Sequence, residues 1–229
     1  MRHFSESAGS LEIDCRYPDN AVGRVVYLLE PVKVMPGLED FCESRSTALV
    51  SVFGMDWDND LTPWPAPNVR KKCPDFGGGA GRFLEVLGNE VVPMVEDRLL
   101  GPGNRFDPSG RSLVGISLAG LFAVWASFLS GLFGSIASVS GSFWYDGFTE
   151  WIGNQVVPPV VRRVYLSVGE REKESRNPLF SRIEGCTAEV RKLLESRGLE
   201  VAFELNPGNH IADGVPRLRK ALDWLLALI

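Results

Sequence analysis

Short runs of hydrophobic residues recur along the chain, and segments with helical periodicity separate them. The runs contain few charges, which is typical of parallel strands buried on both faces of a sheet. Their alternation with helices predicts an α/β fold with a mostly parallel, doubly wound sheet, whose ligands bind at the carboxyl ends of the strands. We predict strands at residues 24–31, 47–54, 112–117, 135–141, 162–169 and 201–206, with 10–17 as a further candidate.

Three segments have the spacing of amphipathic helices. In residues 82–99, Phe83, Leu87, Val91 and Val95 recur at four-residue intervals, and Pro93 inside this pattern predicts a kink or break. Two further helices are predicted at residues 185–198 and 213–229. In the last one, a single face carries the larger aliphatic residues: Leu218, Leu222, Leu225 and Ile229.

The stretch from Ser112 to Trp144 contains no charged residue and is longer than the ~20 residues of a membrane-spanning helix. Glycines and serines interrupt it, and it divides into a β-branched piece, a helical piece and a second β-branched piece. A strand and a helix at the centre of a parallel sheet have this composition without any contact with lipid. We therefore expect a buried core and no membrane association.

Charge and cysteine content narrow the class of protein further. The formal net charge is −5 and the pI is near 5.2, so no basic surface indicates nucleic acid as a partner. The cysteines are scattered, without a C-x-x-C pair, at positions 15, 42, 73 and 186. This spacing favours reduced thiols in a cytoplasmic protein over a zinc site, although a Cys42–Cys73 disulfide stays open. No secretory signal is visible in residues 1–14, and no metal or other cofactor is expected.

The sequence Gly-Ile-Ser-Leu-Ala at residues 115–119 lies where a predicted strand meets a predicted helix. It nearly matches G-x-S-x-G, the sharp turn that exposes a nucleophilic serine at the top of a sheet. Ala119 replaces the second glycine, and Gly120 follows it. The motif alone is weak, because Ser117 is equally compatible with an ordinary small residue in a tight turn. Its place between strand and helix favours the nucleophile.

Only two histidines are available as a general base for Ser117. His3 lies in a terminus that we expect to fray. His210 follows the predicted strand 201–206 in the loop NPGNH, at the end of the sheet where ligands bind. We therefore predict His210 as the base.

The acid that orients the histidine should follow the strand 162–169, because the chain order in this kind of site is Ser, acid, His. Glu170 and Glu172 both lie there, and Glu172 is slightly preferred for its reach toward a neighbouring loop. Both could instead be solvated charges paired with Arg171 or Lys173.

Two backbone N–H groups should stabilise the oxyanion that forms during acyl transfer. The amide of Leu118 follows the nucleophile and opens a helix, whose dipole favours negative charge. The second donor should lie after the strand 24–31. Since Pro31 has no N–H, we place it at Val32.

Six segments in order resemble the putative-esterase family of α/β-hydrolases, which includes siderophore (enterobactin-type) esterases and esterase D. They are VVYLLEP, the loop DLTPW with FGGGAGRFLEVLGNEVVPMVEDRL, GISLAGLFA, SVSGSFWYDG, VYLSVGEREKE and NPGNH. The resemblance implies an α/β-hydrolase fold in a single domain, residues 1–229, without a sizeable lid. It implies a carboxylic-ester hydrolase with Ser117 as nucleophile, His210 as base and Glu172 as acid, although some siderophore esterases work with a Ser–His dyad.

The resemblance implies a small-molecule ester as substrate, with esters of iron-chelating siderophores as the candidate class. The irregular segment 54–81 is long for a compact domain, which is typical of a functional loop. Together with residues 143–145 it could form an aromatic pocket that includes Trp64, Phe76, Trp144 and Tyr145, or these residues could simply fill the core. Arg70, in a basic cluster with Lys71 and Lys72, could contact an anionic substrate, or it could be solvated.

Two other functions fit the same residues. An acyltransferase or thioesterase differs only in the acceptor or the leaving group. A non-catalytic scaffold used for binding has the same fold, since a fold alone does not guarantee activity.

Overall fold

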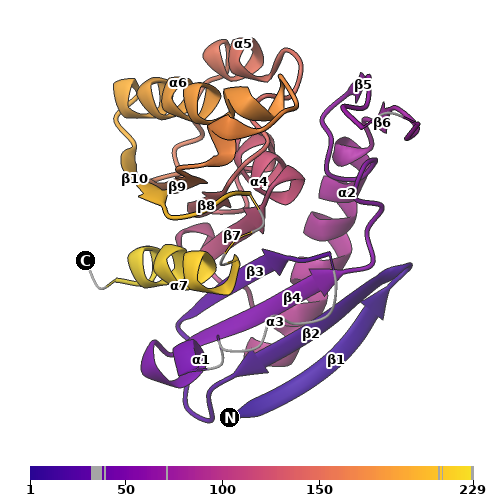
Figure 1. The fold of residues 1–229 in the computed structure, drawn as a ribbon. Helices are drawn as coiled ribbons and strands as arrows, with labels where there is room; N and C mark the ends of the chain where they lie inside the picture. The colour runs from indigo at the N-terminus through magenta and orange to yellow at the C-terminus, as the bar shows by residue number, and fades with distance from the viewer. Residues whose placement is uncertain (32–37, 39, 71, 211, 213, 228–229) are drawn as a thin grey trace.

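The computed structural model describes residues 1–229 except 32–37, 39, 71, 211, 213 and 228–229. Eight strands form one sheet in the order β1-β2-β4-β3-β7-β8-β9-β10 (Figure 1). The strands from β4 to β10 are parallel, whereas β1 and β2 are antiparallel additions at one edge. Their bounds are Arg2–Ala8 (β1), Leu11–Tyr17 (β2), Arg24–Leu29 (β3), Thr47–Phe53 (β4), Arg111–Ile116 (β7), Ser135–Val139 (β8), Arg163–Gly169 (β9) and Glu200–Asn206 (β10). The mostly parallel α/β sheet predicted from the sequence is thus confirmed.

Helices cover both faces of the sheet. The helices are α1 (Asp40–Ser44), α2 (Ala80–Val86), α3 (Val92–Leu100), α4 (Leu118–Ser130), α5 (Phe148–Gly153), α6 (Ile183–Ser196) and α7 (Gly214–Leu225). In β3, Val25, Tyr27 and Leu29 pack with α2, α3, α4 and α6, while Val26 and Leu28 pack with α1 and α7. Because neighbouring side chains of a strand point to opposite faces, the continuous hydrophobic runs follow from this double cover.

Two local features bear on the sequence prediction. The N-terminal residues form the edge strand β1, in which His3 contacts Asp14 of β2 at 2.9 Å, so the expectation of a frayed terminus was wrong. The segment 82–99 contains a π-helical turn at Leu87–Val91 directly before Pro93, which lies in the first turn of α3. This turn accommodates the proline, and Phe83, Leu87, Val91 and Val95 still reach the core.

The long segment after β4 folds into a short hairpin of β5 (Pro65–Ala66) and β6 (Phe76–Gly77), which leads into α2. In Figure 1 this hairpin lies at the end of the sheet opposite α1. It therefore stands at the same end as the carboxyl ends of the parallel strands.

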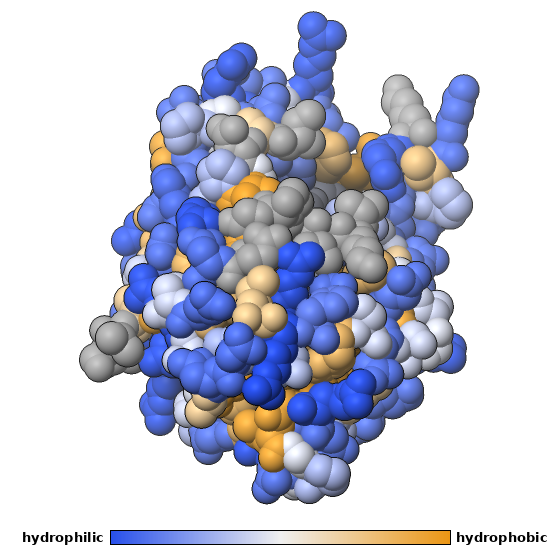
Figure 2. Space-filling view, turned by 90° about the horizontal axis from the view of Figure 1, so that it is seen from below, coloured by the Kyte–Doolittle hydropathy of each residue, from blue (hydrophilic) through white to orange (hydrophobic). Residues whose placement is uncertain are grey.

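The charge-free stretch 112–144 forms β7, α4 and β8 in the interior. None of the helices that the structure describes combines the length and hydrophobicity needed to span a bilayer. Hydrophilic residues predominate on the face shown in Figure 2. All four cysteines are free thiols, with Cys42 buried and Cys73 exposed, so the two do not form a disulfide.

Candidate active site

Ser117 occupies the turn between β7 and α4. Its backbone has φ 60° and ψ −122°, a conformation that L-residues rarely adopt. The Ser117 amide donates to the carbonyl oxygen of Val139 at the end of β8, at 3.0 Å. This strained turn holds the hydroxyl out at the carboxyl end of the sheet, as a nucleophile elbow requires.

The departure at Ala119 has a structural explanation. A Cβ on Gly115 would lie 2.4 Å from the carbonyl carbon of Ala119 and 2.7 Å from the Ala119 Cβ. A Cβ on Gly120 would lie 2.6 Å from the Ser138 hydroxyl. Strand and helix can therefore approach closely because Gly115 and Gly120 have no side chain, and the methyl group of Ala119 fits against Gly115.

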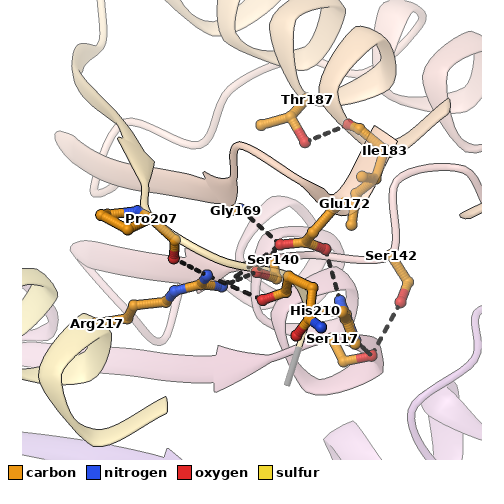
Figure 3. A network of polar contacts seen from close by, with 11 residues as sticks. Ser117, Ser140, Ser142, Gly169, Glu172, Ile183, Thr187, Pro207, His210 and Arg217 are labelled. Atoms are coloured by element: carbon orange, nitrogen blue, oxygen red, sulfur yellow. Dashed lines mark hydrogen bonds and ion pairs between the residues drawn. The ribbon is translucent and has the colours of Figure 1, made fainter. Parts of the chain in front are cut away.

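His210 lies between Ser117 and Glu172 (Figure 3). Its Nε2 is 3.0 Å from Ser117 Oγ, and its Nδ1 is 2.7 Å from Glu172 Oε2. An ionised carboxylate only accepts hydrogen bonds, so Nδ1–H donates to Glu172. In the neutral ring Nε2 is then unprotonated and accepts a hydrogen bond from the Ser117 hydroxyl, which is the arrangement a general base needs.

Glu172 begins a 3₁₀ turn just after β9 and is buried. Its Oε1 accepts hydrogen bonds from the Ser140 hydroxyl and the Gly169 amide, both at 2.6 Å. Burial opposes ionisation, but the hydrogen bonds from His210 and Ser140 outweigh it and lower the pKa of the Glu172 carboxyl. Glu170 is exposed, and its amide donates to Asn206. Of the two candidate acids, Glu172 is the one that contacts the histidine.

The strand register explains why these loops meet. Ile116 of β7 lies opposite Val139 of β8, Val139 lies opposite Ser167 of β9, and Gly169 lies opposite Asn206 of β10. The residues that follow these strand ends therefore emerge side by side, although they are separated by up to 93 positions in sequence.

Sequence reasoning missed three polar residues around this chain of contacts. Ser140, with φ 49°, points its hydroxyl at Glu172, and Arg217 of α7 reaches the same carboxylate from behind (Figure 3). Ser142 Oγ lies 3.3 Å from Ser117 Oγ, and the Ser142 amide donates to the Ser117 carbonyl. For Arg217 the available signal was weak, namely a charged residue directly beside the hydrophobic face of Leu218 and Leu222.

Of the two predicted oxyanion donors, the structure describes only the Leu118 amide. Leu118 is the first residue of α4 and lines the pocket beside Ser117, where its amide belongs to the first turn of a 13-residue helix. Val32 lies outside the described residues.

A pocket of about 540 Å³ opens over Ser117 and His210. Trp144 and Arg70 line it, and Arg70 is paired with Asp58. Trp64 and Tyr145 do not line it. Their side chains connect the two loops instead. The Trp64 indole donates to the carbonyl oxygen of Asp146, and the Tyr145 hydroxyl donates to the carbonyl oxygen of Trp64. Phe76 of the long loop lines it, and so do Trp57 and Phe180, two aromatic residues that composition alone could not place.

Among the residues that the structure describes, no group of three or more His, Cys, Asp or Glu side chains is placed to hold a metal ion. The arrangement consists instead of a hydroxyl, an imidazole and a carboxylate in one hydrogen-bonded chain. Such a chain can remove a proton from the hydroxyl and return it to a leaving group.

Comparison with known proteins identifies the family of the chain and the structures that share its fold. A family model described as putative esterase matches residues 27–213. The uncharacterised protein YbbA of Bacillus subtilis is 29% identical over 194 residues, which are 81% of this chain and 76% of YbbA. An IroE-like serine hydrolase from Shewanella oneidensis superposes with a TM-score of 0.81 at 19% identity, over 98% of this chain and 80% of that one. The siderophore hydrolase EstA of Aspergillus nidulans gives 0.74 at 20% identity, over 98% and 93%. At these identities the two structures show a shared fold.

Proposed function

The chain belongs to the putative esterase family, and we propose that it is a serine esterase that hydrolyses small-molecule carboxylic esters with Ser117, His210 and Glu172 as a catalytic triad. The observation that carries the proposal is the continuous hydrogen-bonded chain from Ser117 Oγ through both ring nitrogens of His210 to Glu172. Its chain order, Ser then Glu then His, is that of α/β-hydrolases.

Acylation begins when His210 Nε2 takes the Ser117 hydroxyl proton. Ser117 Oγ then forms a bond to the carbonyl carbon of the ester, and the carbonyl electrons move to its oxygen. The Leu118 amide at the start of α4 supplies one donor to this oxyanion, and Val32 stays the predicted second donor. The intermediate collapses as the bond to the alkoxy oxygen breaks and His210 protonates the leaving alcohol.

Deacylation repeats the sequence with water. His210 removes a proton from the water, the hydroxide adds to the acyl carbon, and the bond to Ser117 Oγ breaks with return of the proton to the serine. Glu172 stays ionised throughout and stabilises the imidazolium that forms twice per turnover, a role that its lowered pKa supports.

The side chains that line the pocket favour a particular class of ester. Trp57, Phe76, Trp144 and Phe180 give it flat hydrophobic walls, which suit an aromatic or other planar acyl group. Two guanidinium groups, of Arg70 and Arg171, stand at its border, each paired with a carboxylate of Asp58 or Glu174. The aromatic walls, with a siderophore hydrolase among the structural neighbours, support esters of iron-chelating siderophores as substrates. The free thiols support a cytoplasmic location.

The test is labelling with a fluorophosphonate probe, which reacts only with an activated serine. We expect labelling of the wild type and none of Ser117→Ala or His210→Ala. A wild type that is neither labelled nor able to cleave short-chain aryl esters would refute ester hydrolysis. Turnover of simple esters without cleavage of any ferric or iron-free siderophore ester would refute the siderophore assignment alone.

A further inference from the structure

Arg217 is a buried arginine whose side chain is 2% exposed and does not line the substrate pocket. It lies in the first turns of α7, and its guanidinium extends beneath the loops that carry Glu172 and His210 (Figure 3). A charged group is stable in such a place only where several acceptors surround it. The acceptors of Arg217 therefore indicate what it is for.

On the acid side, Arg217 Nη1 donates to the Ser140 hydroxyl oxygen at 3.1 Å and approaches Glu172 Oε1 at 3.5 Å. Ser140 in turn donates to the same carboxylate oxygen. The carboxylate is thus held at Oε1 from behind, which leaves Oε2 directed at His210.

On the histidine side, Arg217 Nη2 donates to the carbonyl oxygens of Pro207 and Asn209 at 2.8 and 2.9 Å. These carbonyls precede His210 by three residues and one residue. A Cβ on Gly169, at the end of β9, would lie 2.7 Å from Nη2, so this glycine leaves the space through which the guanidinium passes.

One rigid planar group therefore bonds to the loop of the acid and to the loop of the base. An arginine can do this because its donors form a fixed fork, whereas a lysine offers a single ammonium centre. Since the Glu172–His210 contact lies between those two loops, its length and direction depend on the same bonds. We propose that Arg217 is a positioning residue that fixes Glu172 and His210 relative to each other, an inference that rests on the proposed function.

The experiment measures the rate of fluorophosphonate labelling, together with kcat and KM for an aryl ester, in Arg217→Met, Arg217→Lys, Glu172→Gln and the double variant Glu172→Gln/Arg217→Met. The matched control is Arg111→Met, which removes another buried arginine that binds a carboxylate, Glu96, at the opposite end of β7 from Ser117. Circular dichroism establishes that each variant is folded. If Arg217→Met does not fold, Arg217→Lys takes its place in the double variant.

We expect Arg217→Met to lower kcat and the labelling rate roughly 10- to 100-fold, below the ~10⁴-fold effect of disabling a triad acid, with KM changed less than about threefold. Arg217→Lys should fall between Arg217→Met and the wild type. In the Glu172→Gln background the same substitution should lower the rate less than about threefold more, because its effect passes through the Glu172–His210 contact, which Glu172→Gln already disables. Arg111→Met should keep the wild-type rate.

Two results would overturn the inference while leaving the proposed function intact. One is a folded Arg217→Met that is labelled and turns over like the wild type. The other is a full multiplicative loss in the Glu172→Gln background, which would indicate a structural role independent of the acid. An unlabelled wild type would instead refute the proposed function, and the inference with it.

Discussion

Replacing Gly115 by alanine should displace the nucleophile, because the strand and helix that hold Ser117 touch at this residue. The added Cβ would lie 2.4 Å from the carbonyl carbon of Ala119, 2.5 Å from its oxygen and 2.7 Å from its Cβ. Ordinary contact between such atoms is about 3.5 Å, so β7 and α4 must separate by roughly 1 Å. Two of the three contacted atoms belong to the backbone, which prevents relief by a change of rotamer.

The expected magnitudes follow from this separation. Overpacking of a buried site lowers the free energy of unfolding by about 1–3 kcal/mol. In a chain of this size, each kcal/mol lowers Tm by roughly 2–4 °C. A displacement of about 1 Å at the reacting atoms lowers kcat on the order of 10²-fold. Both Tm and activity should therefore fall.

Thermal denaturation followed by circular dichroism measures the first effect, and fluorophosphonate labelling the second. The matched control is Gly185→Ala in α6, where no heavy atom lies within 4 Å of the added Cβ. It should raise stability by up to about 1 kcal/mol and leave activity unchanged. A second control, Ala119→Gly, restores the G-x-S-x-G motif and should not raise the labelling rate. A Gly115→Ala protein with wild-type Tm and labelling would refute the assignment of this contact as the constraint on Ser117.

Three further perturbations test other parts of the structure. Glu172→Gln should lower kcat by up to ~10⁴-fold. Because folding lowers the pKa of Glu172, the ionised carboxylate stabilises the folded state above the unfolded-state pKa of about 4.3. This contribution is lost as pH falls through the folded-state pKa. The difference in urea-measured stability between the wild type and Glu172→Gln should therefore shrink in acid. An advantage that grew in acid would contradict the assigned shift. Arg111→Met should lower the free energy of unfolding by about 3–5 kcal/mol, because Glu96 would be left as a buried, uncompensated charge; an unchanged urea midpoint would contradict this. Arg70→Met should change stability by no more than about 1 kcal/mol, since its pair with Asp58 is partly exposed. It should raise KM for an anionic ester more than for a neutral ester of the same size, and equal effects would exclude an ionic contact with substrate.

Much of the fold could be predicted from the sequence because it depends on local patterns. Continuous hydrophobic runs such as 24–31 and 162–169 place strands inside a doubly covered sheet, and the observed strands differ from the predicted ones by only one or two residues at most ends. The strand β1 was missed because its seven residues, RHFSESA, lie at an edge and bury only Phe4 and Ala8. An edge strand needs few hydrophobic residues, so its pattern is weak.

Ser117 was predictable because it lies between a predicted strand and a predicted helix. His210 was predictable because histidines are scarce in this chain and this one follows a later strand. Glu172 was not separable from Glu170 by sequence, because the direction of a side chain after a strand depends on the turn that follows. The 3₁₀ turn buries Glu172 against Ser140 and Gly169, and Glu170 is left exposed.

Sequence patterns were therefore enough to predict the parallel strands and to propose Ser117 as nucleophile and His210 as base, because these inferences need only local patterns and the order of elements along the chain. The tertiary structure was needed to show that Glu172 and not Glu170 contacts His210, and which acceptors surround Arg217. An arginine on an amphipathic helix reads as a surface charge until Ser140, Pro207 and Asn209 surround it. These acceptors come from separate loops, and the register of β8, β9 and β10 brings them together.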